Sequence, residues 1–565
     1  MPARISDVRR RRLSAADQSG LEQWFDRHAS LLAGAFVIVF VISGILTLHN
    51  YGFTWDESLG NLFYGERYLH FFTSFDPRFL NFSADLPILH QYPLHLTAPF
   101  GDPPYIFPPL ADTLSVACMY VFSYWLKWLN PIDGFHLFTI FLAGLFLWTL
   151  YRFLVLRLGK YIAFLAILFL GTFPRFWGDM HFNVKDVPEA VFFGWALMAY
   201  WSWYEKPAWK KALAAGLLTG CTLAVKANAL FIPVVLILVI LPWSRRLQPW
   251  LDVLRHLKKY LFHYALMALS AVALYILSWP YLYANVYLGL KAYWGFIFHL
   301  STKGSLHWQI DPIRQTLTIM PEVMLILSFL GLVLLVYKAI REKAPFYRLL
   351  LLWVAVPILR VSVPSAVNFD GIRHFLEFVP AAAVIAAVGA DQFVRWIAAR
   401  KWLPQFALQV LLVAVIVANL VQINLLFYPY LHLYYNQFTG GLSGARDSFL
   451  GREATDYWAV SYRPGMEWLN ENAPPNAKLV VPVAGWVANL EAPLLLRPDI
   501  QIVQSMPDGS VMQASKDPYY IMFILRGGLG SAEDEVDYTM GRGELVHQIF
   551  VDRVPVLYFY RFGGD

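Results

Sequence analysis

The sequence predicts an all-α polytopic membrane protein of about eleven transmembrane helices, with a small C-terminal α/β extracytoplasmic domain. Three observations predict this fold class. Of the 565 residues, 58% are hydrophobic and only 15% are charged, and the apolar residues form runs as long as a bilayer-spanning helix. Soluble domains carry about 25% charged residues. The composition therefore excludes an ordinary soluble enzyme and a disordered or nucleic-acid-binding chain.

The first apolar run covers residues 31–48 and follows a basic N-terminal segment, residues 1–30. We expect that segment to stay in the cytoplasm, because Lys and Arg are enriched on that side of membrane proteins. Ten further spans are placed near residues 135–153, 161–176, 188–204, 211–225, 228–243, 261–279, 317–337, 349–366, 373–392 and 404–426.

The apolar stretch near 111–128 is assigned as an interfacial or re-entrant helix. Counting it as a span would move Arg152, Arg157 and Lys160 to the outer side. With eleven spans, every basic cluster falls on the same side, and the net charge of +6 is that of the cytoplasmic loops. The predicted location is the inner or plasma membrane.

The spans define a transmembrane catalytic domain over residues 31–426, with outer loops at 49–134 and 280–316. The tail, 427–565, has ordinary charge density and β-like runs such as Lys478-Leu-Val-Val and Val554-Pro-Val-Leu-Tyr. It is long enough for one small mixed domain, which the topology places outside the cell.

Two carboxylates, Asp56 and Glu57, lie just past the outer end of the first span. Asp56 or Ser58 could cap a helix that continues through Leu62, since capping is the common task of such residues. A carboxylate held at the membrane surface is also suited to act as a general base. The two roles are compatible.

A short outer loop gathers five polar residues within eight positions: Asp179, His181, Asn183, Lys185 and Asp186. The loop could be a solvated turn in which Lys185 neutralises Asp186. Because connectors between apolar helices rarely carry so many polar groups, and ionisable groups near the membrane mark functional sites, we favour a function.

Two further cationic positions interrupt apolar sequence. Lys226 either extends to the interface or meets an anion. Arg373 and His374 stand at the outer start of a late span, where Arg373 either binds phosphate oxygens or pairs with Asp370 as an anchor. The topology places Asp56, Asp186, Lys226 and Arg373 at one membrane face, which suits deprotonation of a nucleophile beside an anionic leaving group.

The sequence lacks the Gly-rich motifs that cradle nucleotide phosphates, and the outer loop at 280–316 lacks metal-ligand spacing. An activated substrate at an outer site must then come from the membrane lipid. No cofactor is identified. Whether Asp56 and Asp186 share a divalent cation is left open by the sequence.

These residues form an ordered set of motifs: Asp56-Glu57, the segment from Asn183 to Pro188, and Arg373-His-Phe. The set resembles GT-C glycosyltransferases of the protein O-mannosyltransferase-like group, which includes the lipid A aminoarabinose transferase and bacterial family-39 enzymes. The resemblance implies a polyprenyl-phosphate sugar donor, with mannose as one sugar, an outer-face site and inversion at the anomeric carbon.

The resemblance also implies roles for single residues. Asp56 corresponds to the catalytic base, Glu57 helps to position the acceptor, and Asp186 matches a second acidic position. The donor-phosphate candidates are Lys185, Lys226, Arg373 and His374, and the weaker substrate-positioning candidates are His181 and Asn183. One departure is Phe107, which stands where several relatives have a phosphate-binding Lys before Pro-Pro.

Two alternatives lack transferase chemistry. A lipid or sugar transporter, such as a flippase, fits many spans with intramembrane charges, but predicts broken helices at matching positions in two halves. The second alternative is a non-catalytic membrane scaffold whose outer tail binds a partner, but it does not explain why Asp56, Asp186 and Lys226 are predicted at the same membrane face. The expected partners are membrane lipid, the lipid-linked sugar and an acceptor protein or glycan, with no nucleic acid.

Overall fold

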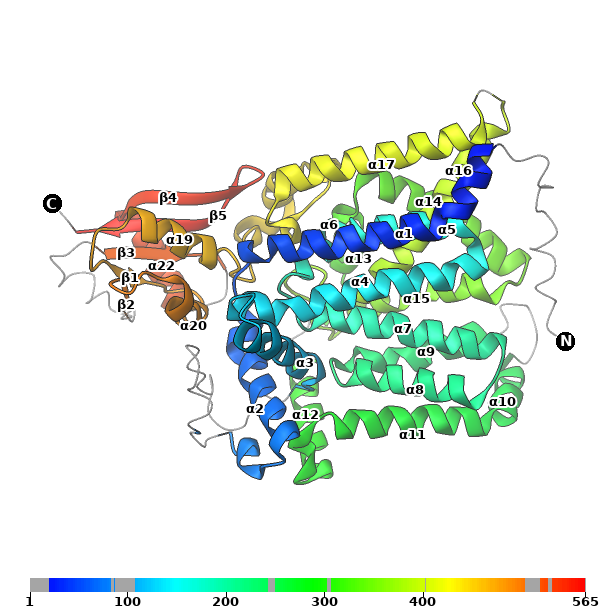
Figure 1. The fold of residues 1–565 in the computed structure, drawn as a ribbon, viewed down its shortest axis with the longest axis horizontal. Coiled ribbons are helices and arrows are strands. Elements are labelled where there is room, and N and C mark those ends of the chain that lie inside the picture. The colour runs from blue at the N-terminus through cyan, green and yellow to red at the C-terminus, as the bar shows by residue number, and fades with distance from the viewer. Residues whose placement is uncertain are drawn as a thin grey trace.

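The computed structural model describes residues 20–82, 86, 107–241, 249–301, 306–401, 403–503, 519–526 and 531–563. Its helices form an elongated bundle, and a small sheet lies at the end of the long axis opposite the start of the first helix, at Gly20 (Figure 1). The predicted fold class is confirmed in outline, as a mostly helical chain with a small C-terminal sheet. The basic segment 1–19 lies outside the described residues.

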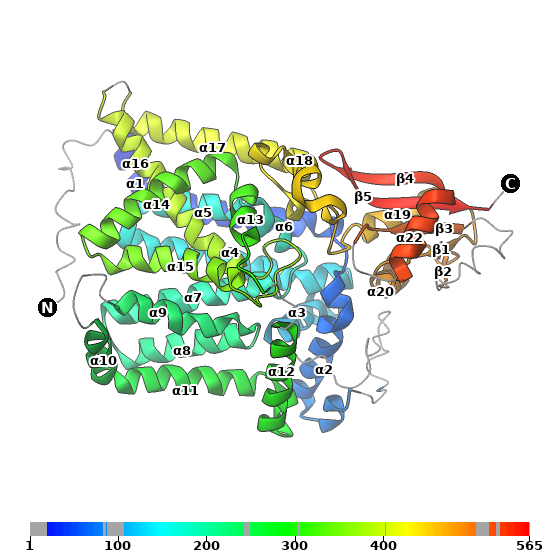
Figure 2. The same cartoon turned by 180° about the vertical axis from the view of Figure 1, so that it is seen from behind.

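The bundle is built from helices that the chain forms before residue 428. They are α1 (Gly20–Thr47), α2 (Leu62–Ser74), α3 (Leu110–Met119), α4 (Pro131–Leu158), α5 (Lys160–Gly171), α6 (Pro174–Asp179), α7 (Asp186–Glu205), α8 (Trp209–Leu223), α9 (Ile232–Ile240), α10 (Pro249–Lys259), α11 (Leu261–Leu277), α12 (Val286–Ser301), α13 (Asp311–Ile319), α14 (Glu322–Arg341), α15 (Pro345–Ser362), α16 (Val379–Ala398) and α17 (Gln405–Phe427). Both views show α8 and α11 side by side, and α8 also packs against α7 (Figures 1 and 2).

The predicted count of eleven spans is too high. Within the described residues, six helices are long and apolar enough to cross a bilayer, or seven if the bent pair of α10 and α11 is one span. The predicted spans near 161–176, 211–225 and 228–243 correspond to α5, α8 and α9, which have 12, 15 and 9 residues. At about 1.5 Å per residue, none of these reaches the roughly 30 Å of a hydrocarbon core. The apolar sequence continues through the turns that end these helices, so hydropathy alone overestimates their length.

The predicted outer loops contain helices of their own. The stretch near 111–128 forms α3 and a following π-helical segment, Tyr120–Trp125, and it is not one of the helices long and apolar enough to cross a bilayer. Trp125 and Trp128 are exposed there, as expected for aromatic residues at a membrane interface. The loop at 280–316 contains α12.

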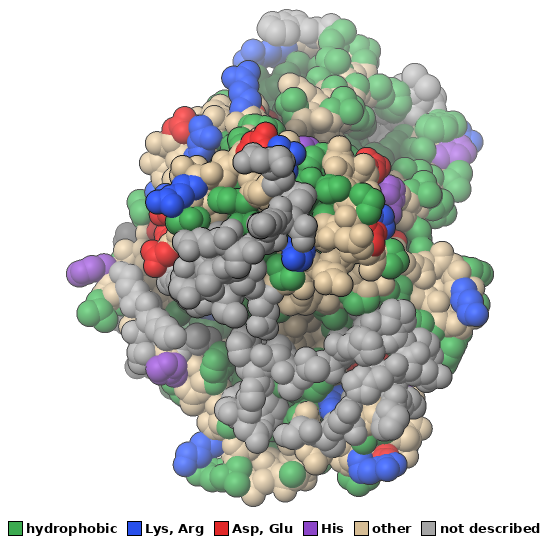
Figure 3. Space-filling view, turned by 90° about the vertical axis from the view of Figure 1, so that its left-hand side faces the viewer, with side chains coloured by type: hydrophobic (Ala, Val, Ile, Leu, Met, Phe, Trp, Pro, Cys, Tyr) green, Lys and Arg blue, Asp and Glu red, His purple; other side chains and the backbone are tan. Residues whose placement is uncertain are grey.

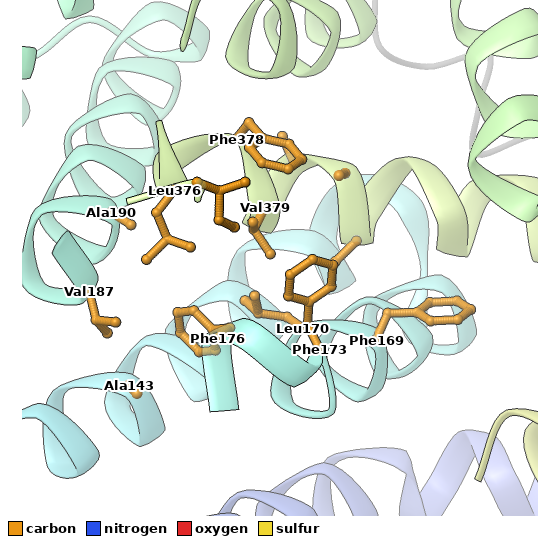
Figure 4. Close-up of a cluster of buried hydrophobic side chains, with 14 of the residues drawn as sticks. Ala143, Phe169, Leu170, Phe173, Phe176, Val187, Ala190, Leu376, Phe378 and Val379 are labelled. Carbon is orange, nitrogen blue, oxygen red and sulfur yellow. The ribbon is translucent and has the colours of Figure 1, made fainter. Parts of the chain in front are cut away.

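A buried apolar cluster anchors the helix ends that carry the polar residues discussed below (Figure 4). Val187 and Ala190 from the first turns of α7 contribute to it, together with Leu376 and Phe378 from the short 3₁₀ turn before α16. Burying a side chain of this size contributes roughly 1.5–3 kcal/mol. The positions of Asp186 and of the segment before Leu376 are therefore fixed by core packing next to them in sequence.

The C-terminal region forms one five-stranded mixed sheet in the order β2-β1-β3-β5-β4. β1 runs parallel to β2 and β3, while β5 runs antiparallel to β3 and β4, with Lys478 opposite Tyr519 and Val551 opposite Val554. The β-like runs of the sequence lie in these strands. The elements are α18 (Gly441–Ala445), α19 (Tyr462–Asn472), β1 (Lys478–Val480), α20 (Gly485–Leu495), β2 (Gln501–Ile502), β3 (Tyr519–Phe523), α22 (Ser531–Arg542), β4 (Glu544–Val551) and β5 (Val554–Phe562).

The sheet domain is docked on the segment that follows α1. Glu491 of α20 accepts a hydrogen bond from the backbone N–H of Phe53, and a Cβ on Gly52 would overlap its Oε1. Arg463 of α19 donates to the carbonyl of Tyr51 at 3.0 Å and to Asp133 at 2.6 Å. Because the contacts are buried and hydrogen-bonded, the domain holds the chain immediately before residue 56 in place.

This docking is expected to weaken as pH rises. Burial raises the pKa of Glu491 to about 8, only partly offset by the hydrogen bond from Phe53 and by Arg463. A carboxyl whose folded pKa is raised above its unfolded value contributes stability at low pH that is lost as pH rises through the folded pKa. The melting temperature of the detergent-solubilised protein should therefore fall between about pH 5 and pH 8.

Glu491→Gln should flatten that pH dependence, because the amide oxygen still accepts from Phe53 but has no proton to lose. Glu544→Gln, at an exposed position of β4 in the same domain, is the matched control. Equal slopes of melting temperature against pH for Glu491→Gln and the wild-type protein would contradict the assignment.

Candidate functional site

Arg373 lies at the centre of the polar cluster and joins carboxylates from distant parts of the chain. Its Nη2 contacts Asp56, its Nε lies 3.4 Å from Asp186 Oδ2, and its Nη1 donates to Asp370 Oδ2 at 3.2 Å. One face of the guanidinium covers Trp458, 4.2 Å from the ring centroid. Burial disfavours the charge, but the three carboxylates outweigh it and raise the pKa of Arg373, so it stays protonated.

Asp186 opens α7 and is held by a cation on one side and an amide on the other. Lys226 Nζ donates to Asp186 Oδ1 at 2.6 Å and to the carbonyl of Arg373 at 3.3 Å. Asn183 Nδ2 donates to Asp186 Oδ2 at 2.9 Å, and Asn183 Oδ1 accepts from the Asp186 N–H at 2.8 Å. Asn183 therefore orients Asp186 through contacts with both its side chain and its backbone.

Asp56 is the most exposed carboxylate in contact with Arg373. Its side chain is 23% exposed, against 1% for Asp186 and 6% for Asp370. It stands at the N-cap of the π-helical turn Glu57–Asn61 but makes no side-chain capping hydrogen bond. The capping role predicted for Asp56 is therefore wrong, and its carboxylate is directed to Arg373 instead.

Glu57 points away from this cluster. Its Oε2 accepts from the N–H of Thr54 at 2.8 Å and lies 3.1 Å from His136 Nε2 of α4, and the side chain is buried. It fixes the turn that carries Asp56, and the predicted role in positioning the acceptor is not supported by this placement.

Lys185 is also turned away from Arg373. Its Nζ donates to Asp112 Oδ2 at 2.6 Å and to the carbonyl of Pro108 at 2.7 Å, which ties α3 to the start of α7. Phe107, the position where the sequence departs from the motif that it resembles, contacts Phe296 of α12 edge to face. This placement does not support the predicted role of Lys185 in binding the donor phosphate.

Lys185→Met is expected to destabilise the protein by about 3 kcal/mol, because it leaves Asp112 buried without its partner. The double variant Lys185→Met/Asp112→Leu should recover most of the lost melting temperature, since an apolar pair can replace a buried ion pair. Thermal melts of the detergent-solubilised proteins test this. A double variant less stable than Lys185→Met would show that the two residues do not act as a pair.

The two histidine candidates have different surroundings. His181 is fully buried, bonds Thr47 Oγ1 and the Trp177 carbonyl at 2.8 Å each, and stacks on Tyr51. It is therefore a core residue, contrary to the predicted role in substrate positioning. His374 packs edge to face on Phe369, and its Nε2 is buried without a hydrogen-bond partner.

A second layer lies behind Lys226 and His374. Arg360 contacts Glu377 at 2.7 Å and also donates to Asn228 Oδ1 and to the His374 carbonyl. These contacts fix the backbone between Arg373 and Leu376. Arg360 therefore holds the segment that presents Arg373.

Sequence reasoning missed two residues that touch or adjoin the cluster, Asp112 and Arg526, and it named Asp179 only among the polar residues of the short outer loop. Asp179 is buried beside Arg175, and burial raises the pKa of Asp179 to about 7 despite that cation. Trp458 was not assigned a role. Asp370 was considered only as an anchoring partner of Arg373, a contact that the structure shows. No pattern in the sequence linked Arg526 to the site, because it lies far in sequence from the other residues of the cluster.

Among the described residues, no group of three or more His, Cys, Asp or Glu side chains is arranged to hold a metal ion. Asp56 and Asp186, the pair considered for a shared cation, both contact the guanidinium of Arg373. The cluster as a whole therefore presents a partly exposed carboxylate, Asp56, beside two cations, Lys226 and Arg373.

No protein-family model and no curated protein matches the chain. Among solved structures, it is similar to ArnT from Cupriavidus metallidurans bound to undecaprenyl phosphate, with 15% identity, a TM-score of 0.47, and coverage of 94% of this chain and 97% of that one. It is also similar to the Archaeoglobus fulgidus oligosaccharyltransferase tethered with an acceptor peptide, with 13% identity, a TM-score of 0.46, and coverage of 89% and 70%.

A third similar structure is the arabinofuranosyltransferase AftD from mycobacteria, with 13% identity, a TM-score of 0.38, and coverage of 94% of this chain and 40% of that one. All three are GT-C superfamily glycosyltransferases, the superfamily that the sequence motifs resemble.

Proposed function

We propose that this protein is an inverting glycosyltransferase that moves a sugar from a polyprenyl-phosphate donor to an acceptor hydroxyl on the outer face of the membrane. The observation that carries the proposal is the direct contact between residues from separate parts of the sequence. Asp56 and Asp186 both contact Arg373, and Lys226 contacts Asp186. Such a cluster holds both a proton acceptor and groups that stabilise an anionic leaving group.

The exposed members of the cluster are the ones that the reaction needs. The side chains of Asp56 and Lys226 are 23% and 21% exposed, and that of Arg373 is 11% exposed, while Asp186 is buried. A donor phosphate can therefore reach Lys226 and Arg373, with Asp186 holding the two cations together from behind. Arg suits this task because its planar fork matches phosphate oxygens.

The proposed reaction has one displacement step. Asp56 accepts the proton of the acceptor hydroxyl while the hydroxyl oxygen forms a bond to the anomeric carbon. The bond from that carbon to the phosphate oxygen breaks, and polyprenyl phosphate leaves with the electron pair. Lys226 and Arg373 stabilise the charge that develops on the phosphate. Attack from the side opposite the leaving group inverts the anomeric carbon.

The distribution of charged residues between the two ends of the molecule supports an extracytoplasmic location for the candidate site. The end of the molecule that carries the C-terminal domain presents acidic, basic and histidine side chains (Figure 3). Among the described residues, basic side chains such as Arg157, Lys338 and Arg395 lie at the opposite ends of the helices (Figure 1), which we assign to the cytoplasm by the positive-inside bias. The N-terminus is then cytoplasmic and the sheet domain extracytoplasmic, in a multi-pass protein of the inner or plasma membrane.

The donor class follows from the membrane setting. A site on the outer face has no access to cytosolic nucleotide sugars, whereas a polyprenyl tail places an activated sugar within the bilayer beside the helices. Mannose is the first sugar to test because the sequence motifs resemble O-mannosyltransferases. The acceptor is proposed to be a protein or glycan hydroxyl.

The decisive experiment measures transfer of radiolabelled sugars in membranes, with a panel of polyprenyl-phosphate donors. We expect one donor to label a protein or glycan fraction only in membranes that contain this chain. If the labelled lipid instead crosses reconstituted vesicles without losing its sugar, the chain is a transporter. If neither transfer nor crossing occurs with any donor, the scaffold alternative replaces the enzyme.

A further inference from the structure

The C-terminal domain places one arginine directly at the candidate site. Arg526 follows β3 and donates through Nη2 to both oxygens of Asp370, at 3.1 and 3.0 Å. Its Nη1 donates to the carbonyl of Tyr457 at 2.6 Å, and the side chain is largely buried. Charge-assisted hydrogen bonds of this kind are stronger and more directional than neutral ones.

Arg526 also covers Trp55, the residue immediately before Asp56. Its guanidinium carbon lies 4.3 Å from the centroid of the Trp55 ring. The backbone N–H of Trp55 donates to the carbonyl of Trp458, whose ring in turn lies under Arg373. Trp55 contacts Trp486 of α20 edge to face as well. The backbone that carries Asp56 is therefore held from the sheet domain.

Arg526 thus reaches the base and the cation by two separate routes. Through Asp370, it shares the carboxylate that contacts Arg373 at 3.2 Å. Through Trp55, it touches the segment that presents Asp56. Neither route depends on the other, and both start from a single side chain of the C-terminal domain.

We propose that Arg526 is a positioning residue that completes the pair of Asp56 and Arg373 when the C-terminal domain is docked on the bundle. This inference rests on the proposed glycosyltransferase function and adds a role for the domain in building the site. Without Arg526, Arg373 would be the only one of these two arginines left to pair with the Asp370 carboxylate. Arg373 would then bind Asp370 more tightly and be less available to the donor phosphate.

The kinetic consequence is specific. Arg526→Met should raise the KM for the polyprenyl-phosphate sugar about tenfold, with a smaller fall in kcat. Adding Asp370→Asn should restore the donor KM toward the wild-type value, because the carboxylate that draws Arg373 away is then neutral. A purely structural role for Arg526 would not predict rescue by removal of a second charged residue.

The matched control is Arg561→Met, which removes an exposed arginine paired with Glu544 in the same domain. All variants are made in the full chain and compared with the wild-type protein by melting temperature and gel filtration. The proposal is supported by a raised donor KM in Arg526→Met that Asp370→Asn reverses. It is overturned if Arg526→Met and Arg561→Met have the same donor KM, or if the added Asp370→Asn brings no recovery.

Hydrogen exchange tests the positioning role without any turnover. We expect the amides around Trp55 and around Asp370 to exchange at least tenfold faster in Arg526→Met than in Arg561→Met. Unchanged exchange in both segments overturns the proposal. If the wild-type protein transfers no sugar, the proposed function fails, while accelerated exchange would still assign Arg526 its positioning role.

Discussion

Asp56→Asn is expected to reduce kcat for sugar transfer by about 10²- to 10⁴-fold, the contribution of a general base. The amide has nearly the same shape as the carboxylate but cannot accept the proton of the acceptor hydroxyl. The fold should persist, because Arg373 keeps Asp186 and Asp370 as partners. Transfer assays with saturating donor and acceptor, together with melting temperatures, measure both expectations.

The same substitution should tighten binding of the lipid phosphate. Asp56 contacts Arg373 in the structure, so the donor phosphate must compete with a carboxylate for the guanidinium. Removing that negative charge should lower the Kd for polyprenyl phosphate about tenfold, which corresponds to about 1.4 kcal/mol. The expected combination is slower turnover with tighter binding of polyprenyl phosphate. Local unfolding would instead lower both the turnover rate and the affinity.

The control for Asp56→Asn is Asp76→Asn. Asp76 is paired with Arg78 on an exposed turn after α2, so it reproduces the loss of an Asp–Arg contact outside the cluster. We expect Asp76→Asn to retain wild-type kcat. Turnover by Asp56→Asn within a few fold of the wild-type rate would contradict the assignment of Asp56 as the base.

The sequence alone predicted the residues that the topology could place on one face. Asp56, Asp186, Lys226 and Arg373 each lie at or beside a helix end, so knowing which ends face outward was enough to group them. The structure shows that they are in contact, directly or through one neighbour.

Neighbouring residues were harder to assign, because direction around a helical turn decides what a side chain meets. Successive residues of a helix point about 100° apart, so Glu57 faces His136 while Asp56 faces Arg373. Lys185 likewise pairs with Asp112 rather than with Asp186, which follows it. A pattern of polar residue types carries no information about such directions.

Contacts between distant segments were beyond any local pattern. Arg526 meets Asp370 across 156 residues, and Arg373 meets Asp56 across 317. The first depends on how the sheet domain docks, which no periodicity in the sequence specifies. The second could be inferred only because the predicted topology places both residues at the same membrane face.

Arg373→Gln is the second substitution with a large expected effect. Arg373 is the cation shared by the base, by Asp186 and by the proposed phosphate position, and its neutral replacement should lower kcat/KM by about 10²- to 10³-fold, as for other groups that stabilise developing charge. Arg373→Lys should be intermediate, because an ammonium keeps the charge but cannot hold several oxygens in one plane. Transfer kinetics at varied donor concentration measure both.

Donor binding distinguishes this role from that of Asp56. Arg373→Gln should weaken binding of polyprenyl phosphate, whereas Asp56→Asn should strengthen it, since one variant removes an attractive charge and the other a competing one. Arg446→Gln, which removes an exposed arginine paired with Asp447, is the control for the loss of a positive charge. If Arg373→Gln binds the lipid phosphate as tightly as Arg446→Gln does, the phosphate lies elsewhere. Lys226 would then be the cation to replace next, because it is the other partly exposed positive charge in contact with Asp186.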